Sequence, residues 1–136
     1  MHLEMINPEA LGAPRGYSNG VLTPAGGRLL FVAGQIAWNS KQEIVGDAFV
    51  LQFSQALKNV LAVVEAAGGQ AADVASMTIY VTDKEAYIRE IKDVGSAYRA
   101  LMGRHFPAMA LVEVKGLLEP MAQVEIQAVA VLASKR

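Results

Sequence analysis

The chain has 136 residues, a length that suits one compact domain spanning residues 1–136. Hydrophobic residues make up 53% of it, charged residues 18%, and the net charge is −1. Such a chain creates no electrostatic field that attracts RNA or DNA, so nucleic acid is not expected as the main partner. The absence of cysteine excludes disulfides and thiolate sites, and the two histidines, His2 and His105, are too few to predict a metal site. No cofactor is expected.

The start of the chain, residues 1–8, has neither a basic segment nor a long apolar one, so no secretory signal is predicted. No uninterrupted apolar run approaches the length of about 18 residues that a membrane span needs. A cytoplasmic protein without membrane contact is therefore expected. The surplus of apolar residues predicts subunit interfaces, and closed rotational symmetry makes a trimer or another ring a reasonable expectation.

The first third of the chain predicts short strands. Residues 3–6 suit an edge strand, which Asn7 and Pro8 end. Residues 20–23 and 28–33 flank Pro24-Ala25-Gly26-Gly27, a sequence typical of a hairpin turn. The two segments are therefore predicted to pair with each other.

Two helices alternate with the remaining strands. Asp47 is a candidate cap for a helix from Ala48 to the Gly68-Gly69 pair. β-Branched residues predict a strand over residues 74–81, and Asp83 is a candidate cap for a second helix ending near Met102. The apolar residues recur at three- and four-residue spacing in both helices; those on the predicted inner face of the second are Ile88, Ile91, Val94, Tyr98 and Leu101.

Strands are predicted over residues 108–114 and 123–132, which completes an α/β (α+β) fold. Each helix has one apolar stripe, so both helices should cover the same face of a mixed sheet. The other face has few charges in the last strands. We expect it to pack against neighbouring subunits.

Four stretches, in this order along the chain, carry a resemblance to a known family. They are residues 17–20 (YSNG), 31–36 (FVAGQI), 56–68 (ALKNVLAVVEAAG) and the segment Phe106-Pro107-Ala108 continuing to residues 124–128 (VEIQA). With these stretches the chain resembles the RidA (YjgF/YER057c/UK114) family. The resemblance implies a chorismate-mutase-like homotrimer with small-molecule pockets between subunits, and an enamine/imine deaminase activity, a hydrolysis that releases ammonia.

The resemblance also implies roles for three residues. Tyr17 matches a loop tyrosine that closes over the ligand, and Gly34 matches a glycine whose backbone amide contacts the substrate. Glu125 matches a glutamate that positions the attacking water. A carboxyl group there suits proton transfer to an enamine or imine. Catalysis is therefore assigned to Glu125 and Tyr17.

Four positions depart from the family pattern, and all four lose polarity. Met109 stands where the family has an arginine that forks onto the substrate carboxylate, and a thioether cannot replace that bidentate contact. Losing such a partner costs about 2–5 kcal/mol of binding. The other departures are Ala33, Leu111 and Gly95. With Gly34 and Met109 they make up the expected substrate-binding set, and they predict a substrate less acidic and more apolar than 2-iminobutanoate.

Several alternatives stay open. Arg15 and Arg104 are possible substitutes for the missing arginine, although both are more typical of solvated surface charges. Met109 and Leu111 could equally line a pocket for an apolar ligand in a non-catalytic, chaperone-like trimer. Ribonuclease activity, a third alternative, is disfavoured by the acidic balance. His105 is interpreted as a helix-exit residue and Trp38 as a loop aromatic.

Overall fold

The computed structural model of the protein describes residues 2–134. These residues form strands and α-helices together with two short 3-10 turns, η1 (Glu9–Leu11) and η2 (Ala71–Asp73). In chain order the remaining elements are β1 (Glu4–Ile6), β2 (Gly20–Leu22), β3 (Arg28–Gln35), α1 (Phe49–Ala66), β4 (Val74–Val81), α2 (Lys84–Arg89), α3 (Ile91–Met102), β5 (Ala108–Glu113) and β6 (Val124–Leu132).

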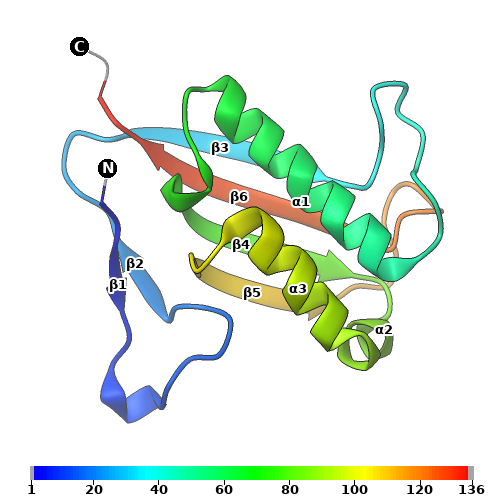
Figure 1. The fold of residues 1–136 in the computed structure, drawn as a ribbon, viewed down its shortest axis with the longest axis horizontal. Helices are drawn as coiled ribbons and strands as arrows, with labels where there is room; N and C mark the ends of the chain where they lie inside the picture. The colour runs from blue at the N-terminus through cyan, green and yellow to red at the C-terminus, as the bar shows by residue number, and fades with distance from the viewer. Residues whose placement is uncertain (1, 135–136) are drawn as a thin grey trace.

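The four longer strands form one mixed sheet in the order β3-β6-β4-β5. β4 and β5 run parallel, whereas β6 is antiparallel to both of its neighbours. The helices lie together on one face of this sheet (Figure 1). The fold is therefore α+β with a mixed sheet, as the sequence predicts.

The hydrophobic core lies between the helices and this sheet. β4 alternates between buried and half-buried residues, and its odd-numbered residues from Met77 onward face the helices. Leu57 and Val60 of α1 and Ile126 of β6 are fully buried opposite them. Burying each such side chain stabilises the fold by about 1.5–3 kcal/mol. β4 and β6 are thereby fixed in register, which determines the face on which each later site residue lies.

The predicted pairing of residues 20–23 with 28–33 is wrong. β2 pairs with β1, with Met5 opposite Val21, and the two form a separate ribbon away from the main sheet (Figure 1). The turn does reverse the chain, and Gly26 has a φ of 83°. However, β6 offers β3 a ladder from Arg28 to Gln35, whereas β2 is only three residues long. Long-range pairing with β6 therefore overrides the local hairpin.

The predicted second helix is in fact two helices, α2 and α3, which meet at Glu90. Glu90 has a φ of −108° and a ψ of 23°, outside the regular helical values. The break rotates the apolar stripe: Val94 and Tyr98 are buried, but Ile88 and Ile91 are 54% and 51% exposed. The predicted inner face is thus correct for Val94 and Tyr98, and Leu101 is half-buried against the core, whereas Ile88 and Ile91 lie outside it.

The two predicted helix caps have different outcomes. Asp83 is confirmed, because its Oδ1 accepts a hydrogen bond from the Glu85 backbone N–H at 3.0 Å. Asp47 is not a cap: α1 begins at Phe49, and Ala48 takes the cap position without a side-chain acceptor. Asp47 instead accepts a hydrogen bond at its backbone carbonyl from Gln123.

The face of the sheet opposite the helices has no cover from the described chain at β3. Phe31 and Leu29 are 73% and 61% exposed there, although both are large apolar residues. A large apolar patch on a folded surface commonly marks a protein–protein interface.

No helix within residues 2–134 is long and apolar enough to cross a membrane.

Candidate active site

The loop before β2 is fixed to the start of β5 by Ser18. The Ser18 backbone N–H donates to the Pro107 carbonyl at 3.0 Å, and its hydroxyl donates to the Phe106 carbonyl at 2.6 Å. Ser18 is buried and forms an isolated parallel bridge with Ala108. These contacts cover the free edge of β5 and hold Tyr17 beside it.

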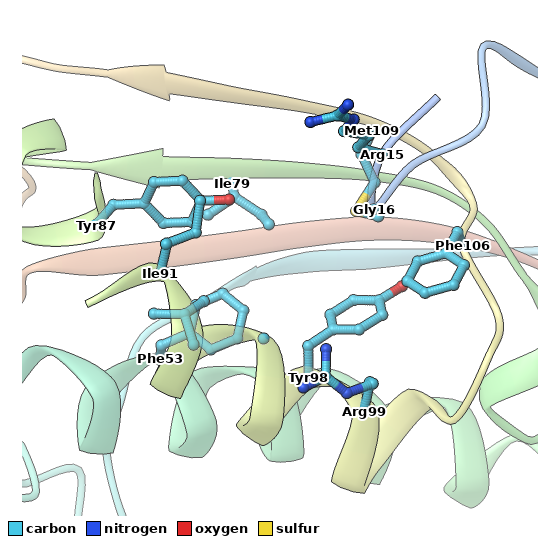
Figure 2. Close-up of a pocket in the computed structure, with 12 residues that line it drawn as sticks. Arg15, Gly16, Phe53, Ile79, Tyr87, Ile91, Tyr98, Arg99, Phe106 and Met109 are labelled. Atoms are coloured by element: carbon cyan, nitrogen blue, oxygen red, sulfur yellow. The ribbon is translucent and has the colours of Figure 1, made fainter. Parts of the chain in front are cut away.

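A cavity of about 270 Å³ lies between β5 and α3 (Figure 2). Met109 lines it from the strand side, and Tyr98 and Gly95 line it from α3. Its volume is close to the lower end of the roughly 300–1,000 Å³ that is typical of ligand sites. Met109 is half-buried and packs against the core, so it is part of the cavity wall.

A second, smaller cavity of about 130 Å³ adjoins the first and shares Met109 with it. Tyr17 and Leu111 line this second cavity. Tyr17 is 38% exposed, so its side chain lines the cavity without being enclosed. The structure therefore brings together Tyr17, Met109, Leu111 and Gly95 on the helix side of β5.

Arg15 also lines both cavities, beside Met109 (Figure 2). The sequence interpretation of Arg15 as a surface charge is thus incomplete: the residue is exposed, but it lies at the cavity. Arg104 is exposed and lines neither cavity.

A residue that sequence reasoning missed is Arg99, on the α3 side of the larger cavity (Figure 2). A helical side chain leans over the preceding turn, so Arg99 reaches back over the residue four positions earlier, Gly95. A Cβ added at Gly95 would lie 3.2 Å from Arg99 Nη1. The glycine thus leaves the space that the guanidinium occupies. In the sequence, the four-residue spacing between Gly95 and Arg99 was the pattern that could have predicted this contact.

The far wall of the larger cavity is a pair of stacked aromatic rings. The ring centroids of Tyr98 and Phe106 are 5.5 Å apart and their planes differ by 9°. The Tyr98 hydroxyl donates to the His105 carbonyl at 2.6 Å, and burial raises the pKa of this phenol far above its usual range. Tyr98 therefore stays neutral and contributes an apolar surface.

Gly34 and Glu125 form a separate half-site on the opposite face of the sheet. A Cβ added at Gly34 would lie 2.8 Å from Glu125 Cδ and closer still to Oε2. Only glycine lets the carboxylate pack against the β3 backbone in this way. Ile36 and Trp38 line the cavity of about 230 Å³ in front of Glu125.

The predicted site is therefore divided within one chain. Glu125 alternates with Val124 and Ile126, which are buried under the helices, so its side chain points to the other face. Ala33, exposed next to the buried Val32, lies on that face as well. Met109 and Leu111 lie on the helix side, so within one chain the sheet separates them from Glu125.

No group of three or more histidines and carboxylates that could hold a metal ion occurs within residues 2–134. His105 lies beyond the end of α3, as predicted, and its Nε2 is 2.7 Å from the Val74 carbonyl oxygen. The ring is thus part of the packing between α3 and β4.

Comparison with known proteins identifies the family of the chain. Residues 7–132 match the family described as Endoribonuclease L-PSP. The 2-iminobutanoate/2-iminopropanoate deaminase of Salmonella typhimurium is 34% identical over 108 residues, which cover 77% of this chain and 80% of the relative. The chain therefore belongs to the Endoribonuclease L-PSP family, which includes the RidA/YjgF proteins.

Solved structures show the same fold. YyfB from Yersinia pestis, a Rid-family protein of unknown function, superposes with a TM-score of 0.85 and 32% identity, covering 97% of this chain and 100% of that one. Escherichia coli TdcF with bound serine superposes with a TM-score of 0.67 and 29% identity, covering 90% and 92%.

Proposed function

We propose that this protein is an enamine/imine deaminase-like hydrolase that acts as a homotrimer on a substrate with a more apolar body than 2-iminobutanoate. The main observation behind the proposal is that the Glu125 carboxylate packs against Gly34. The carboxylate and the β3 backbone at Gly34 therefore lie together at one cavity. The similarity to a named imine deaminase supports the reaction type.

The proposed reaction converts a C=N bond and water into a carbonyl and ammonia. Water adds to the imine carbon while Glu125 accepts one water proton and passes it to the nitrogen. The resulting C–N bond then breaks, the hydroxyl proton moves to the nitrogen, ammonia leaves and a C=O bond forms. Gly34 presents its backbone amide beside the reacting group, and Tyr17 covers the ligand.

A homotrimer joins the two half-sites in this proposal. Tyr17 and Met109 lie on the helix side of β5, while Gly34 and Glu125 lie on the other face, so one chain cannot enclose a single substrate between them. The exposed Phe31 on that second face supports burial against another copy of the chain. Each pocket then combines β5 of one subunit with β3 and β6 of the next.

Ammonia release tests the proposal. An amino-acid oxidase generates imino acids in solution, and we expect the protein to accelerate ammonia release from an aromatic imino acid more than from 2-iminobutanoate. Glu125→Gln should lower that rate by about 10²-fold or more, the usual size of an acid–base contribution. Glu65→Gln, which removes the same charge from an exposed residue of α1 outside this cavity, is the control for a general effect of altered charge.

Three outcomes contradict the proposal or one of its parts. An aromatic imino acid and 2-iminobutanoate that are both hydrolysed no faster than in buffer would favour the non-catalytic binding trimer. An unchanged rate in Glu125→Gln would remove the carboxylate from the reaction. Efficient turnover of 2-iminobutanoate alone would contradict the interpretation of Met109.

A further inference from the structure

We propose that Arg99 binds the anionic group of an apolar or aromatic carboxylic acid in the cavity between β5 and α3, while Arg15 adds positive charge at the strand side. Recognition of the carboxylate is thereby moved from strand position 109 to the α3 side. The identity of the reacting group rests on the proposed function above, whereas anion binding at Arg99 is tested without it.

The cavity is lined by positive charge. Its lining includes two arginines, Arg15 and Arg99, and no aspartate or glutamate. The two arginines lie on different sides of the cavity, Arg15 beside Met109 and Arg99 on α3 (Figure 2). A cavity with cationic edges and no acidic residue favours an anion over a cation or a neutral polar ligand.

The rest of the cavity wall is mainly apolar. Between the two arginines the cavity is lined by aromatic and aliphatic side chains, including Phe106, Tyr98 and Ile79. Tyr98 is neutral, and its hydroxyl is used by the His105 carbonyl, so it does not compete with a ligand for the cations. The fitting ligand thus has an apolar or aromatic body and one anionic group.

Gly95 makes room for the Arg99 side chain. An added Cβ would be 3.2 Å from Arg99 Nη1, tighter than an ordinary van der Waals contact of about 3.5–4.0 Å. A Cβ at position 95 would therefore move the guanidinium by a few tenths of an ångström, and a larger side chain would move it further. The loss of polarity at positions 95 and 109 is then accompanied by a cation at position 99, whose planar fork suits a carboxylate.

The sequence prediction of a less acidic substrate changes accordingly. A small imino acid finds no arginine at position 109 of β5 to bind its carboxylate. It is also too short to reach Arg99 on α3. A larger imino acid keeps its charge partner on α3 while its apolar body fills the space beside Met109. We therefore expect discrimination by the size of the apolar body, with the negative charge retained.

Calorimetric titration of the full chain with 3-phenylpropanoate, butanoate and 3-phenylpropanamide tests the inference. 3-Phenylpropanoate should bind more tightly than the other two. Arg99→Gln should weaken its binding by about tenfold, equivalent to about 1.4 kcal/mol, and should leave the amide unaffected. Arg104→Gln removes the same charge from an exposed residue outside the cavity and should leave all three affinities unchanged.

Gly95→Ala is a second variant with a distinguishing signature. Alanine is the better helix former, so the melting temperature should rise, while the added Cβ shifts the Arg99 guanidinium by a few tenths of an ångström and should weaken 3-phenylpropanoate binding. A merely structural role for Gly95 would not weaken binding in a more stable protein.

The inference is overturned if wild type fails to bind 3-phenylpropanoate at millimolar concentration, if the amide binds as tightly as the acid, or if Arg99→Gln behaves like Arg104→Gln. Ammonia release is measured separately. If the binding pattern holds and no imine is hydrolysed, the proposed function fails while the anion site stands.

Discussion

Replacing Gly34 by alanine tests whether the position of the Glu125 carboxylate limits the rate. The new Cβ would lie 2.8 Å from Glu125 Cδ and 3.0 Å from Cγ. Ordinary contacts between such atoms are about 3.5–4.0 Å, so the carboxylate must move by roughly 1 Å. A misplacement of about 1 Å can lower a rate by about 10²-fold. We therefore expect Gly34→Ala to lower the rate of ammonia release by about that factor.

The stability of Gly34→Ala should change much less than its rate. Glu125 is only half-buried and can rotate towards solvent, and alanine restricts the unfolded chain more than glycine does. We expect the free energy of unfolding, measured by urea denaturation, to stay within about 1 kcal/mol of wild type. A large loss of stability would mean that the variant cannot report on the site.

A double-mutant cycle identifies the route of the effect. If Gly34→Ala acts through the carboxylate, it should lower the rate of wild type but have no further effect in Glu125→Gln. Ammonia release is measured for all four proteins with the same aromatic imino acid. A wild-type rate in Gly34→Ala, or fully additive losses in the double variant, would refute this reasoning.

Four further predictions concern the cavity, the assembly and the core. Met109→Arg restores a guanidinium at the strand side, so kcat/KM for 2-iminobutanoate should rise by about tenfold or more, and no rise would contradict the assigned role of position 109. Phe31→Glu places a charge on the exposed β3 face and should yield a smaller species in light scattering, whereas an unchanged mass would exclude this face as the interface. Ser18→Ala removes a buried hydroxyl that donates at 2.6 Å to a carbonyl, so the free energy of unfolding should fall by about 1–3 kcal/mol in urea denaturation, and no fall would mean that the loop is held otherwise. Tyr98→Phe should destabilise by about 1 kcal/mol at pH 9 through loss of the bond to His105. Burial raises the Tyr98 pKa above the unfolded value of about 10, so the unfolded chain releases this proton first and wild type loses stability above about pH 10 by up to about 1.4 kcal/mol per pH unit. The difference between the two proteins should therefore shrink between pH 9 and 11, and a constant difference would contradict it.

The sequence by itself determined the elements whose signals are local. Residues 74–81 form the predicted strand because β-branched and alternating apolar residues fit a half-buried pleated surface. Asp83 caps a helix because its short acceptor reaches the free amide two residues on. The ordered motifs also identified the family, which the match over residues 7–132 confirms.

Only the tertiary structure decided the features that depend on competition between distant segments. β3 pairs with β6 because a long ladder outweighs a short local hairpin, and no local pattern reports that comparison. The faces of β5 and β6 separate Met109 from Glu125, since side-chain direction follows from register in the folded sheet. Arg99 enters the cavity because Gly95, one turn earlier on the helix, leaves the space open, and neither residue alone predicts that.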